Sequence, residues 1–481
     1  MTRGTWIIAV VVAFGGCRCG CSGQKREIGL ARTPGSGDPV VVVDRPVEGG
    51  GGSGASVYSG PMTPETEPND TREKAGALGL PGGIEGALGS PTDIDFYKID
   101  PGAARMVNVR LIGPAADGGG ADLVLTLYDA DGKTIAQSDR GPAGTLEALP
   151  NFGLGQGAAH FVSVSSFAKK EKRKKAKEAA AKPAELAPGE KPAPPGSYQL
   201  TAEVFRPAAG EESEPNDDAT GAREVLLDEE MSGYAGWSKD RDHWKLNLAG
   251  FRGGYVLDLA IEGVEGVGLV ADLIGGDGKP VATRKSDKGR GLRVRAFLPE
   301  AGAKQWLLRL AGSRSNPEVP YKLKTSAREL AEGEEAEPND DAARAITIGP
   351  LGDGQQGERR GYLDGGDVDA YKLEGVREPL SLTLSIDPPA GVDVSLRVLA
   401  GTKEIVKADT GKVGAREEVD VVRLPAGESL VVLVGGTALG DEPDPYVLRW
   451  STKADLGAPA PVPAPAPKGD DGDPPTDDPY E

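Results

Sequence analysis

Three short acidic stretches decide the fold of this chain. They are Glu65-Thr66-Glu67-Pro68-Asn69-Asp70, Glu212-Ser213-Glu214-Pro215-Asn216-Asp217 and Glu335-Ala336-Glu337-Pro338-Asn339-Asp340. All three follow the pattern E-x-E-P-N-D, which we call the acidic motif. Because the same six-residue pattern occurs three times, the chain is expected to contain three copies of one structural unit.

A second pattern, D-x-D-x-Y/W-K, follows each acidic motif, and we call it the aspartate motif. Its second aspartate is Asp95, Asp242 or Asp369, and it lies 26, 26 and 30 residues after the asparagine of the acidic motif. These nearly constant separations indicate that both motifs belong to a unit of fixed internal geometry.

Strands are expected after each aspartate motif, because apolar residues alternate there with polar ones. The alternating sets are Val107/Val109/Leu111, Tyr255/Leu257/Leu259/Ile261 and Leu380/Leu382/Leu384/Ile386, and each copy closes with a Tyr-x-Leu strand at Tyr198, Tyr321 or Tyr446. Seven or eight short strands per copy predict an all-β chain. Its fold class is three tandem antiparallel β-sandwich, jelly-roll-like domains with disordered termini. The expected domains are 64–206, 207–329 and 330–455.

The composition excludes several classes of function. The chain of 481 residues carries a formal net charge of -19, which argues against nucleic acid as a partner. Two histidines and three cysteines are too few for most zinc, haem or Cys/His nucleophile chemistry. Because no catalytic motif is found, we expect no enzymatic activity. Trp306 is expected in a core, Trp237 is a candidate exposed aromatic that could stack on sugars, and His243 is expected to be a surface or half-buried residue.

The N-terminus predicts export. A short apolar run from Trp6 to Phe14 is typical of a signal peptide over 1–16, and Phe14-Gly15-Gly16-Cys17 resembles a bacterial lipobox. The resemblance implies lipidation of Cys17; an ordinary signal peptide followed by a metal or disulfide knot is the alternative. Arg18 favours the outer membrane, on its periplasmic face or at the cell surface. A Gly/Ser/Pro-rich tether is expected over 17–63, and a disordered Ala/Pro and acidic tail over 456–481.

A basic insertion lengthens the first copy. Residues 168–195 contain a run of lysines followed by an Ala/Pro-rich stretch. It could contact the phosphates of lipopolysaccharide or another acidic polymer. The alternative is a mobile, solvated run of charge.

The motifs together resemble the bacterial pre-peptidase C-terminal (PPC) domain, a β-sandwich usually found beside secreted proteases. The resemblance covers about residues 64 to 453, although no peptidase domain precedes the repeats. In related collagen-binding sandwiches these acids share calcium, which takes hard oxygen ligands. The implied ligands are Glu65, Glu67, Asn69, Asp70 and Asp95; Glu212, Glu214, Asn216, Asp217 and Asp242; and Glu335, Glu337, Asn339, Asp340 and Asp369.

Two other interpretations of the acids stay open. The aspartates Asp93, Asp240 and Asp367 lie two residues before the second aspartates, where the collagen-binding pattern has no acid. Pro-Asn-Asp can also form an Asx-type turn, with aspartates capping backbone N–H groups. The motif therefore predicts either a calcium site or turn chemistry.

The expected function is that of a lipid-anchored cell-envelope protein with non-catalytic binding or adhesion modules. Calcium would stabilise the modules, and an extracellular polysaccharide or protein would be the partner. Several weak sites on one anchored chain would then act together. The alternative is a structural spacer or an assembly or secretion accessory without a specific ligand. The sequence does not indicate an oligomeric state.

Overall fold

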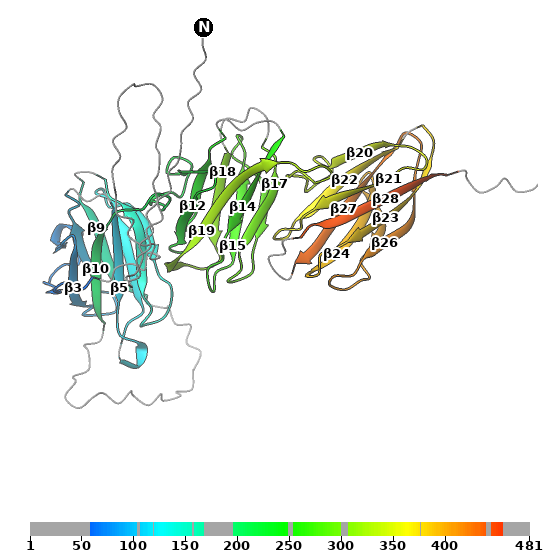
Figure 1. Ribbon diagram of the computed structural model, residues 1–481. Helices are drawn as coiled ribbons and strands as arrows, with labels where there is room; N and C mark the ends of the chain where they lie inside the picture. The colour runs from blue at the N-terminus through cyan, green and yellow to red at the C-terminus, as the bar shows by residue number, and fades with distance from the viewer. Residues whose placement is uncertain are drawn as a thin grey trace, which may run out of the picture. The chain divides into compact units, whose positions relative to one another are not determined.

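A computed structural model describes residues 58–102, 106–118, 120–155, 158–167, 196–248, 254–299, 306–375, 377–438 and 444–455 (Figure 1). Its helices are two 3-10 turns, η1 (Arg72–Lys74) and η2 (Ala116–Gly118). Neither is long and apolar enough to cross a membrane. The described chain is therefore all-β, as the alternating patterns predicted.

The strands form six sheets, two in each copy of the repeat. The first repeat contains β1 (Thr63–Pro64), β2 (Gly76–Leu78), β3 (Gly82–Ala87), β4 (Ile94–Ile99), β5 (Met106–Ile112), β6 (Leu123–Tyr128), β7 (Thr134–Ser138), β8 (Glu147–Gly153), β9 (His160–Ser166) and β10 (Ser197–Phe205). The second contains β11 (Arg223–Val225), β12 (Glu230–Ala235), β13 (Asp242–Leu246), β14 (Tyr255–Ile261), β15 (Leu269–Ile274), β16 (Pro280–Lys285), β17 (Leu292–Phe297), β18 (Trp306–Gly312) and β19 (Asn316–Glu329). The third contains β20 (Ile346–Leu351), β21 (Gln356–Gly361), β22 (Val368–Gly375), β23 (Leu380–Asp387), β24 (Val392–Ala400), β25 (Lys403–Ala408), β26 (Glu417–Leu424), β27 (Ser429–Ala438) and β28 (Tyr446–Ala454).

The strand order is the same in every repeat. One sheet follows β3-β10-β5-β8 in the first repeat, where β1 adds an edge strand beside β3, β12-β19-β14-β17 in the second and β21-β28-β23-β26 in the third. The other follows β2-β4-β9-β6-β7, β11-β13-β18-β15-β16 and β20-β22-β27-β24-β25. The predicted alternating strands coincide with β5, β14 and β23, and the Tyr-x-Leu strands with β10, β19 and β28. Apolar side chains from both sheets of a repeat form one core cluster per repeat, which is the arrangement of a β-sandwich.

Strand pairing is mixed, which corrects the expectation of purely antiparallel sheets. The short strands β2, β11 and β20 pair parallel with β4, β13 and β22. The reason is the path of the chain: it leaves β2, forms β3 in the opposite sheet, and returns to the first sheet as β4. Two strands separated by such a crossover run in the same direction.

Candidate functional site

The aspartate motif and the closing tyrosine meet in the interior of every repeat. Because side chains two residues apart on a strand share a face, the second aspartate points the same way as the Tyr or Trp that follows it. The closing tyrosine reaches both. Its hydroxyl oxygen lies 2.6, 2.8 and 2.6 Å from the carboxylate of the second aspartate in the pairs Tyr198–Asp95, Tyr321–Asp242 and Tyr446–Asp369. It also contacts Tyr97, Trp244 or Tyr371, at 2.5, 2.9 and 2.6 Å.

The first glutamate of each acidic motif joins this group. One oxygen of Glu65, Glu212 or Glu335 accepts the backbone N–H of Ala87, Tyr234 or Tyr362. The other oxygen of Glu65 lies 3.0 Å from the Tyr198 hydroxyl, and that of Glu335 lies 3.2 Å from the Tyr446 hydroxyl. The motifs that recur in the sequence therefore converge on one place in each repeat.

The second glutamate and the asparagine shape the backbone of the acidic motif. The carboxylates of Glu67, Glu214 and Glu337 accept the N–H of the asparagine two residues later, at 2.8, 2.8 and 2.9 Å. The asparagine carbonyl in turn accepts the N–H of the residue after the second aspartate, at 3.0, 3.1 and 3.0 Å. The three Glu-Pro peptide bonds are cis. This network fixes the acidic motif against the strand that carries the aspartates.

A glycine that the sequence reasoning missed makes room for these side chains. A Cβ atom on Gly86, Gly233 or Gly361 would overlap the hydroxyl of the closing tyrosine and the carboxylate of the first glutamate. These glycines lie nine, nine and eight residues before the second aspartate. That spacing was the available signal, since a repeated glycine inside a strand marks a close approach.

Three carboxylates come together in each repeat in a way that suits a metal ion. Their ligand oxygens lie within 4.8 Å of one another in the triads Glu65/Glu67/Asp95, Glu212/Glu214/Asp242 and Glu335/Glu337/Asp369. The triads differ in exposure. In the first repeat Glu67 is exposed and Glu65 half-buried, whereas all six acids of the other two triads are buried.

The second repeat buries four carboxylates in one group. Glu212, Glu214, Asp240 and Asp242 are 1%, 2%, 5% and 2% exposed. Among the described residues none of these four carboxylates takes part in an ion pair, and each keeps one oxygen without a hydrogen-bond partner. The side-chain oxygen of the buried Asn216 also has no partner. Uncompensated oxygens in the interior are costly, so this group requires a cation or protons.

Burial raises the pKa values of these carboxyl groups. Desolvation raises the pKa of Asp242 to about 7, and it also raises the pKa values of Glu212, Glu214 and Asp240, with repulsion from Asp242 next in size. Desolvation raises the pKa of Glu335 to about 8 and that of Asp95 to about 7. Without a bound cation, protons are therefore retained in these groups near neutral pH.

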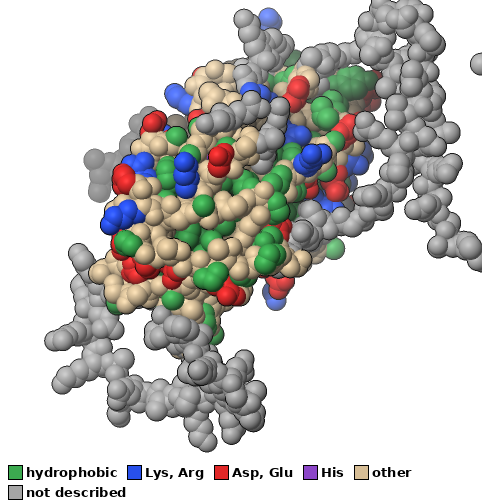
Figure 2. All heavy atoms as spheres, turned by 90° about the vertical axis from the view of Figure 1, so that its left-hand side faces the viewer, with side chains coloured by type: hydrophobic (Ala, Val, Ile, Leu, Met, Phe, Trp, Pro, Cys, Tyr) green, Lys and Arg blue, Asp and Glu red, His purple; other side chains and the backbone are tan. Residues whose placement is uncertain are grey.

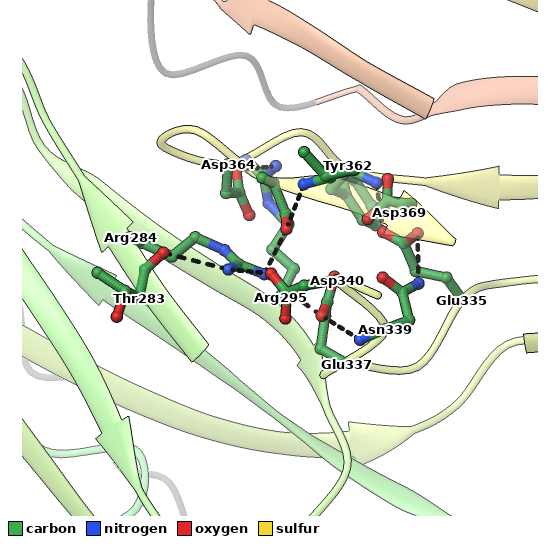
Figure 3. A network of polar contacts seen from close by, with 12 residues as sticks. Thr283, Arg284, Arg295, Glu335, Glu337, Asn339, Asp340, Tyr362, Asp364 and Asp369 are labelled. Carbon is green, nitrogen blue, oxygen red and sulfur yellow. Dashed lines mark hydrogen bonds and ion pairs between the residues drawn. The ribbon is translucent and has the colours of Figure 1, made fainter. Parts of the chain in front are cut away.

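The third repeat has a second triad that includes an acid from each motif. Glu337, Asp340 and Asp367 bring their oxygens within 4.8 Å of one another. Figure 3 shows Arg284, from β16 of the second repeat, reaching toward Glu337 and Asp340. One Glu337 oxygen, one Asp340 oxygen and one Asp369 oxygen remain without hydrogen-bond partners, as does the side-chain oxygen of Asn339.

Some predicted ligands lie outside the triads. Asp70 and Asp217 are exposed and belong to none of the groups described above. Asp93 and Asp240 each accept a backbone N–H, from Gly89 and Gly236, as the turn interpretation expects. The other oxygen of Asp240 belongs to the buried group of the second repeat.

Three other residues singled out in the sequence are buried. Trp306 is 2% exposed, as expected for a core residue. Trp237 is 7% exposed and packs on Phe152 of the first repeat at 5.2 Å between ring centroids, so the suggestion of an exposed sugar-stacking aromatic is wrong. His243 is 8% exposed, so the expectation of a surface or half-buried residue is wrong. It is buried because its Nδ1 lies 3.1 Å from the carbonyl oxygens of Asn216 and Arg241.

The acidic motif also touches the preceding repeat through its main chain. Glu214 accepts from the N–H of Gly153 and donates to the carbonyl of Asn151, at 2.6 and 2.8 Å. Glu337 makes the same pair of bonds with Leu298 and Ala296, at 2.7 and 2.9 Å. The motif thus forms a short parallel bridge to β8 or β17.

Cys17 and the basic insertion 168–195 lie outside the described residues. On the face drawn in Figure 2, acidic and basic side chains are interspersed around hydrophobic ones. The acids of the triads Glu212/Glu214/Asp242 and Glu335/Glu337/Asp369, in contrast, are buried.

No family model matches the sequence, and no curated protein matches it. Solved structures give distant similarities. The triple jelly roll of an archaeal virus is 9% identical with a TM-score of 0.18, covering 82% of this chain and 97% of that one. The CUB1-EGF-CUB2 domain of human MASP-1/3 is 9% identical with a TM-score of 0.16, covering 47% and 94%. The CBM22 tandem of Paenibacillus barcinonensis Xyn10C is 12% identical with a TM-score of 0.14, covering 44% and 82%. At these scores the similarities carry no functional argument.

Proposed function

We propose that this chain is a non-catalytic array of PPC-like β-sandwich modules that bind calcium, carried at the cell envelope by a lipid on Cys17. One observation carries the calcium part of the proposal. Five buried oxygens of Glu212, Glu214, Asn216, Asp240 and Asp242 lack hydrogen-bond partners, and three of these residues bring oxygens within 4.8 Å of one another.

The chemistry of the donors favours calcium over other metals. The triads supply only carboxylate oxygens, and the asparagine adds an amide oxygen. Calcium takes six to eight such hard ligands in flexible geometry, whereas zinc prefers nitrogen and sulfur. A divalent cation at Glu212, Glu214 and Asp242 would compensate buried charge that no arginine or lysine of the described chain offsets.

The array then presents several weak binding surfaces on one chain anchored at the outer membrane. Together these surfaces bind an extracellular polysaccharide or protein. A spacer role is the second candidate, and the main-chain bridges favour it. Because Glu214 and Glu337 are hydrogen-bonded to the preceding repeat, an ion held by their side chains would also stiffen the connection between repeats.

The test is a calcium titration of residues 17–481 with the three cysteines changed to serine. We expect calorimetry to detect calcium binding, and thermal unfolding to shift upward in calcium relative to EGTA, with magnesium as the competing ion. Glu212→Gln should abolish the response of the second repeat. Glu230→Gln, which removes an exposed carboxylate paired with Lys322 at 3.0 Å, is the matched control and should respond like the wild type. Coincident curves for the wild type in calcium and EGTA would refute the proposal.

A further inference from the structure

Arg284 is an unusual side chain for its position. It lies on β16 of the second repeat, is 1% exposed, and projects into the acidic group of the third repeat (Figure 3). Its Nη2 lies 2.7 Å from an Asp367 oxygen and 3.3 Å from a Glu337 oxygen, and its Nη1 lies 2.9 Å from an Asp340 oxygen. One guanidinium therefore contacts three carboxylates at once.

The three carboxylates around Arg284 form the second triad of the third repeat. Their oxygens satisfy the same mutual distance as the other triads, 4.8 Å. Glu337 is 3% exposed, and its Oε1 still lacks a hydrogen-bond partner, as does Oδ2 of Asp340. The triad is therefore a group of three carboxyl oxygens suited to a cation, and the guanidinium supplies a single positive charge to it.

The ladder register shows that only the second repeat places a cation at this strand position. Arg284 pairs with Ala271, while its counterparts Ser138 and Ala408 pair with Leu125 and Leu396. These partners occupy matching places on β15, β6 and β24.

In the first repeat, the residue at the position of Arg284 forms its hydrogen bond within its own repeat. Ser138 donates to Glu147 of its own repeat at 2.6 Å. The residue that corresponds to Glu147 in the second repeat is Leu292, because Glu147 pairs with Leu111 and Leu292 with Ile261 in equivalent ladders. With no acid at that place, Arg284 finds its counter-charges in the following repeat.

We infer that Arg284 is a built-in cation that fills the second acidic site of the third repeat, so that this site takes no divalent ion while the arginine is present. The inference rests on the proposed function, because it assumes that triads of this kind bind calcium. It deepens that proposal by making the repeats unequal: the second and third repeats use calcium at Glu212/Glu214/Asp242 and Glu335/Glu337/Asp369, and Arg284 replaces an ion at Glu337/Asp340/Asp367.

The experiment counts calcium ions per chain by calorimetry and by metal analysis after gel filtration, using residues 17–481 with the cysteines changed to serine. Arg284→Ser introduces the residue of the first repeat and should increase the count by one ion. It should also lower the unfolding temperature in EGTA. Calcium should then raise the unfolding temperature of Arg284→Ser by more than it raises that of the wild type. Arg284→Lys keeps the positive charge and should leave the count unchanged. Arg309→Ser is the matched control, because it removes an arginine of the same repeat that pairs with Asp272 at 2.6 Å and not with a triad carboxylate.

A second variant keeps the inference testable if Arg284→Ser does not fold. Asp340→Asn removes one acid of the arginine-filled triad, so the wild-type number of calcium ions should persist. Loss of an ion in Asp340→Asn would overturn the inference, as would an unchanged count in folded Arg284→Ser. If the wild type binds no calcium but Arg284→Ser binds one ion, the proposed function fails while the assignment of Arg284 stands. If neither binds calcium, both fail.

Discussion

Asp242→Asn should stabilise the protein when calcium is absent, which is the reverse of what loss of a buried hydrogen-bonded residue normally does. The carboxylate is 2% exposed, has no ion pair among the described residues, and lies beside Glu212 and Glu214. Desolvation raises its pKa from 3.8 to about 7. At about pH 8 Asp242 is ionised in both the folded and the unfolded state. The rise in its pKa on folding then lowers the free energy of unfolding by about 4 kcal/mol.

The substitution keeps the shape of the side chain but removes the charge. An asparagine oxygen can still accept the Tyr321 hydroxyl, which lies 2.8 Å from the carboxylate, although the bond weakens by about 1 kcal/mol without the charge. The net gain in EGTA is then about 3 kcal/mol. For a domain of this size the transition that reports the second repeat should rise by roughly 10 °C.

Calcium should stabilise the wild type more than it stabilises Asp242→Asn. Wild type would gain about 2.7 kcal/mol when free calcium is about a hundred times its dissociation constant, whereas Asp242→Asn would gain little. Differential scanning calorimetry in EGTA and in calcium, at about pH 8, measures both effects. Asp272→Asn is the control: it weakens a largely buried ion pair with Arg309 and should lower stability by the same amount in both buffers. A lower unfolding temperature for Asp242→Asn than for wild type in EGTA would refute the reasoning, since the carboxylate would then stabilise the fold without a cation.

Three further outcomes follow from the same geometry. Gly233→Ala should destabilise the second repeat in urea unfolding by about 2 kcal/mol or more, because its Cβ overlaps the Tyr321 hydroxyl and the Glu212 carboxylate; Gly276→Ala, where nothing lies within 4 Å, should change little. Trp237→Ala should cost about 3 kcal/mol and lower the unfolding temperature of the first repeat, whose core it joins, and an effect confined to the second repeat would contradict this. In EGTA the protein should lose stability as the pH rises from about 4 to about 7, because Asp242, whose pKa burial raises from 3.8 to about 7, is ionised in the unfolded state over that window but keeps its proton in the folded state; in calcium the melting temperature should depend less on pH, and parallel pH profiles would count against a metal site.

The sequence was sufficient for the features that depend on local periodicity. The second aspartate and the aromatic residue after it are two positions apart, so a strand necessarily places Asp242 and Trp244 on one face. The strands around Val107, Leu257 and Leu382 were predictable for the same reason, because their alternation extends over several residues.

Features that depend on contacts between distant segments were not predictable. The parallel strands β2 and β11 contain three residues each, too few to show alternation. Trp237 is buried by Phe152, which belongs to another repeat, so its exposure could not be judged from its own neighbours. Arg284 likewise meets Asp340 only where two repeats touch.

The main-chain bridges make each connected repeat depend on the repeat before it in the chain. Glu214 is bonded to Asn151 and Gly153 of the repeat before it, and Glu337 to Ala296 and Leu298, so the acidic motifs of the second and third repeats are held from their N-terminal sides. Losing the first repeat would free one end of the segment that carries the ligands of the second, whereas losing the third would leave the earlier acidic motifs in place. Unfolding of one repeat would therefore loosen the ligand-bearing segment of the repeat that follows it in the chain.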